Sequence, residues 1–269
     1  MQRKYKLVHK IQKHDERDHT FSIERYQSKK LELFTTIINN KKVTNTKPIS
    51  EPSFIIPDLP SIIDQGSLGD CTANAFYYTI MLQTKNDLPL SRLYLYANCR
   101  CIDDIPLNQD DGTTIRTVCK AISNYGLCNE KIYPYIINNY VNLPPLNAYQ
   151  NAKKLKTFSY IFIKQDLNSL KGALTLYKVP IVFGIMIYTS FMSKDVSANG
   201  MVPMPDTKKE KCEGGHCVTL VGYNDANQTF TCANSWGTSW GNKGYFYLPY
   251  AYVTDPNLAM DFCVTSITQ

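Results

Sequence analysis

The stretch DQGSLGDCTANA at residues 64–75 constrains the fold most, because a glycine-punctuated loop gives way to good helix formers at Cys71. Apolar residues then fall on nearly every side of a predicted helix running to Asn86, so we expect that helix to be buried. A helix begins with unpaired N–H groups and a positive dipole end, which stabilise a thiolate there. The stretch therefore indicates either a reactive cysteine or a buried structural one, the more usual state of a free cysteine.

A reactive cysteine needs a base, and the histidine supply is short. Of the four histidines, three lie within the first twenty residues, and His216 is the one in the remaining chain. It follows two glycines and opens a β-rich run, where a histidine is either structural or catalytic. The spacings of Cys99 and Cys101, and of Cys212, His216 and Cys217, lack a matching pair for zinc, so we expect no metal and no cofactor.

The third informative stretch, CANSWGTSWGNKGYFYLPY, runs from Cys232 to Tyr250. It holds both tryptophans of the chain, Trp236 and Trp240, among glycines at 237, 241 and 244, and Asn234 stands just before Trp236. Large aromatic side chains bury well, so core packing accounts for at least part of this pattern.

Together the three stretches resemble the active-site segments of papain and the cathepsins, with Gln65, Cys71, His216 and Asn234 in the family's order. His216 follows Cys71 by 145 residues, within the roughly 130–150 typical of papain-like enzymes, and Asn234 follows 18 residues later. The pattern looks most like the bacterial and giant-virus branch.

The family's C-G-S/A-C-W/Y signature reads LGDCT here. Leu68 replaces a cysteine that is disulfide-bonded in other members, and Gly215 stands where many members have Asp or Asn. Asp70 replaces a small residue, and a carboxylate beside the nucleophile opposes thiolate formation unless it points to solvent.

The resemblance implies a role for each matching residue. Cys71 would be the nucleophile, His216 the general base and acid, and Asn234 the acceptor that orients the imidazole. The Gln65 side chain and the Cys71 backbone N–H would form the oxyanion hole, and Trp236 would shield the His216–Asn234 bond from water.

The resemblance also points to substrate-binding residues. Gly112 falls near a glycine pair that binds substrate as an extra strand, although a plain turn after two aspartates explains it as well. Gly214 and Gly215 precede the base, and Asp261 lies near the region that lines the main specificity pocket, where an acidic floor would favour basic side chains.

The order of predicted elements indicates an α+β protein with a papain-like fold: a mainly helical half at 51–155, an antiparallel β-rich half at 156–269, and the active-site cleft between them. Predicted helices run from a Ser91 cap through Tyr96, from Thr113 or Thr114 to Gly126, and from Asp166 to Lys178; predicted strands cover 158–163, 180–187, 218–224, 228–235 and 244–250, with a loop at 192–215.

Residues 1–50 differ from the rest of the chain in composition, with twelve Lys/Arg against five Asp/Glu. The apolar residues Ile23, Tyr26, Phe34 and Ile37 predict an amphipathic helix there. Two interpretations stay open: a removable inhibitory propeptide, or an extension packed permanently on the domain. The basic charge is mixed with acidic residues and lacks aromatic partners, so we expect no nucleic-acid binding.

The N-terminus has no apolar core of signal-peptide length, and no run reaches the length of a membrane span. We therefore expect a protein that is not classically secreted, does not bind membranes, and is cytoplasmic or, if viral, packaged in a virion. Nine cysteines leave the disulfide pattern open.

The sequence and its resemblance predict a cysteine endopeptidase that acts on proteins or peptides and is made as a zymogen, with its own N-terminal segment as inhibitor. Two alternatives remain: a catalytically silent papain-fold binding protein, and a transglutaminase-like thiol acyltransferase, against which the paired WG motifs argue.

Overall fold

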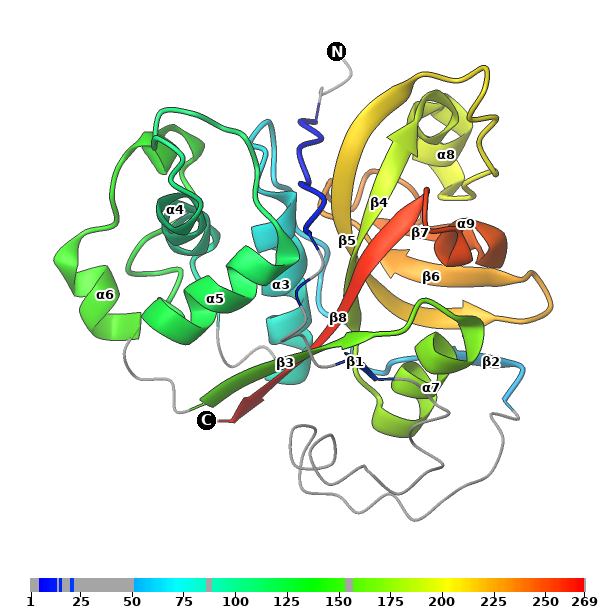
Figure 1. The fold of residues 1–269 in the computed structure, drawn as a ribbon, viewed down its shortest axis with the longest axis horizontal. Helices are drawn as coiled ribbons and strands as arrows, with labels where there is room; N and C mark the ends of the chain where they lie inside the picture. The colour runs from blue at the N-terminus through cyan, green and yellow to red at the C-terminus, as the bar shows by residue number, and fades with distance from the viewer. Residues whose placement is uncertain are drawn as a thin grey trace.

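The fold places a helical half beside a sheet half, with an N-terminal segment between them (Figure 1). The computed structural model describes residues 5–13, 15, 20–21, 51–85, 89–152 and 157–268. The helical half comprises α3 (Cys71–Gln83), α4 (Arg92–Ile102), α5 (Ile115–Tyr125), the 3-10 helix η1 (Ile137–Val141) and α6 (Leu146–Ala152). The predicted α+β class and helix-then-sheet order are confirmed.

Helix α3 begins at Cys71, as predicted from the loop before it. Residues on all its sides are buried, including Ala73, Phe76 and Ile80, because α3 packs between the two halves. It ends at Gln83, where the Thr84 hydroxyl donates to the carbonyl of Ile80 at 2.8 Å. The predicted end at Asn86 lies outside the described residues.

Side-chain caps define the next two helices. Ser91 accepts the Tyr94 N–H at the start of α4, which continues to Ile102, well beyond the predicted Tyr96. Thr114, one of the two predicted caps, accepts the N–H of Thr117 at the start of α5.

Among the described residues, the strands form an eight-stranded sheet in the order β1-β3-β8-β4-β5-β6-β7, with β2 beside β5. All pairs are antiparallel except the two-residue pairing of β1 with β3. The strands are β1 (Thr20–Phe21), β2 (Ser53–Ile55), β3 (Thr157–Ile163), β4 (Ile181–Tyr188), β5 (Cys212–Asn224), β6 (Thr229–Ala233), β7 (Tyr245–Pro249) and β8 (Ala259–Thr268).

Short helices complete the sheet half: α7 (Leu167–Tyr177), η2 (Thr189–Met192), α8 (Lys194–Asn199) and α9 (Tyr250–Thr254). Asp166 caps α7 as predicted, accepting the N–H of Ser169 at 2.8 Å. Strand β4 lies between β5 and β8 and is buried along most of its length, which explains its nearly continuous apolar sequence.

The structure corrects the predicted loop at 192–215, adds a strand and does not describe one predicted helix. The predicted loop at 192–215 contains α8, and β5 already begins at Cys212, because residues 212–220 pair with β4. Strand β8 was not predicted, although it pairs with both β3 and β4. The predicted amphipathic helix through Ile23 and Ile37 lies outside the described residues.

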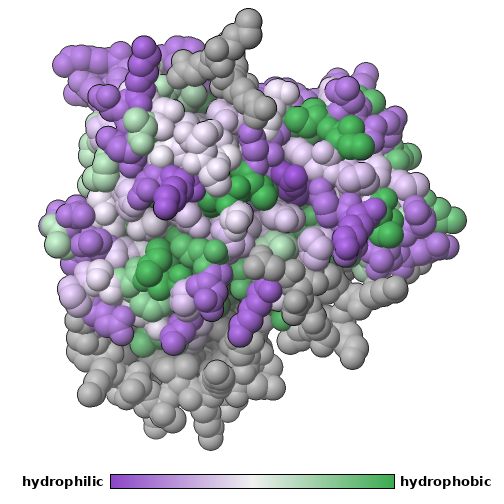
Figure 2. Space-filling model, turned by 180° about the vertical axis from the view of Figure 1, so that it is seen from behind, coloured by the Kyte–Doolittle hydropathy of each residue, from purple (hydrophilic) through white to green (hydrophobic). Residues whose placement is uncertain are grey.

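The surface is mixed. On the face opposite to that of Figure 1, apolar side chains form separate patches among polar ones (Figure 2). No helix within the described ranges is both long and apolar enough to cross a bilayer.

Candidate active site

The predicted nucleophile, Cys71, is the first residue of α3 and is fully buried. Burial is the main cause that raises the pKa of its thiol to about 12; hydrogen bonding from the Cys217 backbone lowers it, and the charge of Asp70 raises it. Burial therefore outweighs the stabilising helix N-terminus, and the thiol is neutral in this conformation.

The predicted base and its orienting residue lie together. His216 on β5 and Asn234, just after β6, join through Nε2 and Oδ1 at 2.8 Å, and both are buried. With Nε2 donating to this amide oxygen, the neutral imidazole keeps Nδ1 as an acceptor. Burial lowers the pKa of His216 to about 4; the bond to Asn234 opposes the shift and His9 adds to it.

Aromatic rings cover one side of this pair. Trp236 stacks on His216 with ring centroids 4.9 Å apart and contacts Phe191 and Trp240 edge-on. Trp236 is 1% exposed and covers a face of the buried imidazole, the position in which it would shield the His216–Asn234 bond from water.

Gln65 lies in the loop before α3 and is tied to the sheet half. Its Oε1 accepts from Ser235 Oγ at 2.6 Å, and its Nε2 donates to the carbonyl of Leu68 at 2.9 Å. One N–H of the amide is used by that bond, so the second remains as a donor for a bound oxyanion.

Asp70, which the sequence marked as a departure, does not point to solvent. It is fully buried, and burial raises its pKa to about 7, with Asp110 adding to the rise while Arg92 and the hydroxyl of Tyr135 oppose it. Tyr135 and Arg92 therefore belong to the site, although their distance from Asp70 in the sequence gave no signal for them.

The segment at residues 5–13 lies between the halves (Figure 1). Tyr5 stacks on Trp236 at 4.6 Å and donates to its carbonyl at 2.9 Å. Lys6 pairs with Asp110 at 2.9 Å, and the backbone N–H of Arg116 donates to Gln12 at 2.9 Å. Both halves thus hold this segment.

The segment covers the predicted substrate-binding residues. The His9 N–H donates to the carbonyl of Gly215 at 2.9 Å. A Cβ on Gly112 would lie 1.9 Å from the Val8 carbonyl oxygen, and one on Gly214 would lie 2.6 Å from that of Leu7. These glycines allow a second backbone to come close.

The His9 side chain fills a buried site beside β4. Its ring leaves no room for a Cβ on Gly184, and its Nδ1 lies 3.3 Å from the Thr72 hydroxyl. Its Nε2 lies 3.8 Å from Asp261, the remaining predicted substrate residue. His9 is one of the three histidines within the first twenty residues, and nothing in the sequence around it indicates a place in the site.

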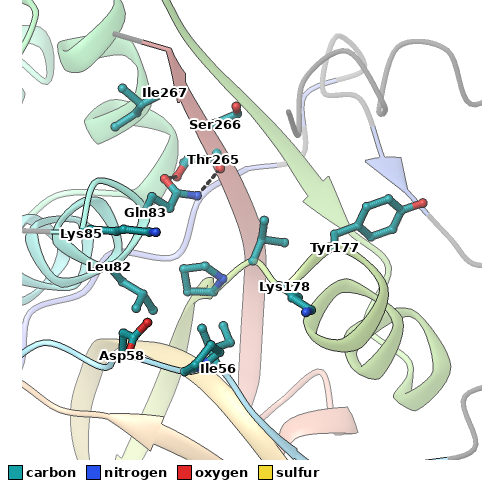
Figure 3. A pocket seen from close by; sticks show the side chains of 13 residues that line it. Ile56, Asp58, Leu82, Gln83, Lys85, Tyr177, Lys178, Thr265, Ser266 and Ile267 are labelled. Carbon is teal, nitrogen blue, oxygen red and sulfur yellow. Dashed lines mark hydrogen bonds between the residues drawn. The ribbon is translucent and has the colours of Figure 1, made fainter. Parts of the chain in front are cut away.

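A cavity of about 200 Å³ lies elsewhere, where the ends of α3 and α7 meet β8 (Figure 3). Leu82, Thr265 and Lys178 line it, and Gln83 donates to the carbonyl of Thr265 at its edge. None of the predicted site residues lines this cavity.

All nine cysteines are free thiols. Within the described ranges, no group of three or more His, Cys, Asp or Glu side chains is placed to hold a metal ion. Cys212 is exposed while His216 and Cys217 are buried, so these three do not form a common binding surface.

A helical half that presents a cysteine and a sheet half that presents a histidine bonded to an asparagine define the class of cysteine peptidases. The chain belongs to the papain family: the sequence pattern described as "Papain family cysteine protease" matches residues 58–263.

Individual relatives agree. The chain is 40% identical over 222 residues to an uncharacterized peptidase C1-like protein of Acanthamoeba polyphaga mimivirus, covering 78% of this chain and 70% of that one. It is 29% identical to cysteine proteinase 3 of Entamoeba histolytica, covering 69% of this chain and 58% of that one. Xylellain, a cysteine protease from Xylella fastidiosa, matches in structure with a TM-score of 0.82 and 29% identity, covering 100% of this chain and 99% of that one.

Proposed function

We propose that this papain-family peptidase is an endopeptidase that cleaves peptide bonds with Cys71, His216 and Asn234. The observation that carries the proposal is the buried 2.8 Å contact between His216 Nε2 and Asn234 Oδ1. It directs the other ring nitrogen of a strand-held imidazole away from the asparagine, and this nitrogen would take the nucleophile's proton.

In this mechanism, His216 Nδ1 takes the Cys71 proton and the sulfur attacks the peptide carbonyl. The C–N bond breaks as the imidazolium gives its proton to the leaving amine, which leaves a thioester. Water, deprotonated by His216, then hydrolyses the thioester and restores the thiol. The oxyanion of each step would accept from the Gln65 amide and the Cys71 backbone N–H.

The neutral state of the pair follows from its burial, and residues 5–13 lie against its neighbours Gly215 and Trp236. Desolvation raises the pKa of Cys71 and lowers that of His216, so each shift favours the uncharged form. Removal of the segment would readmit water and favour the thiolate–imidazolium pair.

We also propose that residues 1–50 act as an inhibitory propeptide. Its residues 5–13 contact both halves and lie against the glycines expected to bind substrate, so substrate and segment compete for one surface. A permanent extension would make the same contacts, and proteolytic removal would distinguish the two.

The side chain of His9 suggests what a substrate would present. Its ring lies beside Gly184 and Thr72 with Asp261 at 3.8 Å, so the pocket accepts a planar or basic side chain next to a carboxylate. We propose Asp261 as the residue that favours basic side chains there.

The test is mass analysis after incubation with an epoxysuccinyl thiol titrant, using the full chain and a shortened chain that begins near residue 51. We expect Cys71 to be labelled much faster in the shortened chain, and Cys71→Ala to abolish labelling. A folded shortened chain, checked by circular dichroism, that resists labelling would identify a catalytically silent binding protein instead.

A further inference from the structure

The most unusual group beside the nucleophile is the buried carboxyl of Asp70. It lies just before Cys71 at the start of α3, yet its side chain makes no cap hydrogen bond with the helix backbone. Its carboxyl group receives hydrogen bonds from the side chains of Tyr135 and Asn74 and from its own backbone N–H, so the donors and acceptors around it can be counted.

Tyr135 has one hydroxyl proton and three acceptors within reach. Its Oη lies 2.8 Å from each carboxyl oxygen of Asp70 and 3.0 Å from the backbone carbonyl of Gln65. If Asp70 is ionised, Tyr135 can give its single proton to the carboxylate, which leaves the buried carbonyl of Gln65 without this donor. It can instead give the proton to that carbonyl, which leaves the carboxylate with only Asn74 and its own backbone N–H as donors.

A proton on Asp70 removes the conflict. Asp70 Oδ1 already accepts from Asn74 Nδ2 at 2.7 Å, so Oδ2 is free to carry the proton. Oδ2 then donates to Tyr135 Oη, and Tyr135 donates to the carbonyl of Gln65. This series of hydrogen bonds, from Asp70 to Tyr135 and from Tyr135 to Gln65, can form only when Asp70 is neutral.

The charges around Asp70 act in both directions. Arg92 from α4 favours the ionised carboxylate, but its guanidinium also lies 3.9 Å from Glu130, so its charge is shared with that second carboxylate. Asp110, from the loop before α5, disfavours a second negative charge here. Burial adds to this, raising the pKa of Asp70 to about 7.

We propose that Asp70 is a positioning residue that works as a neutral acid and holds the Gln65 loop in place through Tyr135. Deprotonation of Asp70 turns the Tyr135 hydroxyl away from Gln65. It also places a negative charge beside Cys71. This inference rests on the proposed role of Cys71 and Gln65 in peptide hydrolysis. Its consequence is a peptidase whose nucleophile is suppressed as the pH rises above neutrality.

Two variants separate the parts of this proposal. Asp70→Asn mimics the neutral acid, since its amide can accept from Asn74 and donate to Tyr135 at every pH. Tyr135→Phe removes the hydroxyl that links Asp70 to Gln65. Tyr133→Phe is the matched control, because its hydroxyl contacts the carbonyls of Asn139 and Asn142 instead.

The first measurement is infrared spectroscopy of the full chain across the neutral pH range. We expect the carbonyl stretch of a protonated carboxylic acid that fades as the pH rises, is missing in Asp70→Asn and persists in Tyr133→Phe. A spectrum without any band that Asp70→Asn removes would overturn the proposal, and this readout does not depend on catalysis.

The second measurement is the rate of Cys71 alkylation by iodoacetamide, followed by peptide mapping of the full chain. Opening of the N-terminal segment affects both proteins alike, so the ratio of Asp70→Asn to wild type isolates Asp70. We expect a ratio near one in mild acid that rises roughly tenfold or more in mild base, since a like charge shifts a neighbouring pKa by about one unit or more.

A ratio independent of pH would overturn the inference while leaving the proposed peptidase intact. Tyr135→Phe should slow alkylation less than it slows peptide hydrolysis by the processed enzyme, because it loosens Gln65 and not the thiol; equal effects on both would contradict the link through Tyr135. Failure of Cys71 to react in every variant at every pH, both in the full chain and in the chain that begins near residue 51, would instead sink the proposed function.

Discussion

Gly184→Ala tests whether the pocket under His9 holds the N-terminal segment closed. Gly184 lies on β4 opposite Cys217. A Cβ there would lie 2.3 Å from His9 Nε2 and 2.5 Å from its Cδ2, and 3.3 Å from Met260. The contact with the imidazole is far below van der Waals distance and that with Met260 is tolerable, so the ring must leave while the sheet remains.

The magnitude follows from what His9 loses. The residue is 6% exposed, and removing its ring from the pocket gives up about 1–2 kcal/mol of burial. Loss of its N–H bond to Gly215 adds about 1 kcal/mol. Together these weaken docking by about 2–3 kcal/mol, which raises the open fraction roughly 30- to 140-fold.

The assay is the rate of Cys71 alkylation by iodoacetamide in the full chain, because so small a reagent does not need the pocket. We expect Gly184→Ala to accelerate alkylation by the factor given above. His9→Ala should have a similar effect, and the double variant should gain little more, since the clash disappears with the ring. Unchanged alkylation in Gly184→Ala, with the thermal stability of wild type, would refute the docking of His9.

Three further outcomes are expected. Gln65→Ala should lower the kcat of the processed enzyme ~100-fold or more with little change in KM, measured with a fluorogenic peptide, because one oxyanion donor is lost. A rise in KM with kcat unchanged would contradict this role. Asn234→Ala should lower kcat/KM by roughly 5- to 150-fold, because a buried N–H of His216 is left without an acceptor; full activity would argue against an orienting role. Asp70 has a folded pKa above its unfolded value, so its protonated form contributes stability that is complete below pH 3.8 and is lost as the pH rises to about 7. Urea unfolding should therefore show that Asp70→Asn gains stability over wild type as the pH rises from 3.8 to about 7, by up to about 4 kcal/mol. A stability difference that stays constant across this pH range would exclude a raised pKa of Asp70.

The features predicted from the sequence are those with local signals. Cys71 was placed at a helix start because Gly66 and Gly69 precede a run of helix formers, and Thr114 and Asp166 were found as caps from their own type and position. Helix starts and caps depend on neighbours within a few residues, so they can be predicted directly from the sequence.

The features that were missed depend on distant partners. Strand β8 owes its conformation to pairing with β3 and β4, about 100 and 80 residues earlier in the chain. Asp70 is held by Tyr135, 65 residues away, so the sequence left open whether its carboxyl group points to solvent, and the structure shows it buried. Residues 5–13 form no regular structure, and their position follows from the surfaces of both halves.

The contact of Tyr5 with Trp236 has an optical consequence. Both tryptophans of the chain, Trp236 and Trp240, lie in one aromatic cluster in edge-to-face contact, so all indole emission of the protein originates beside the histidine. Departure of Tyr5 would uncover one face of Trp236 and shift that emission to longer wavelength. The enzyme thus carries an intrinsic fluorophore that reports release of its N-terminal segment in real time, without any label.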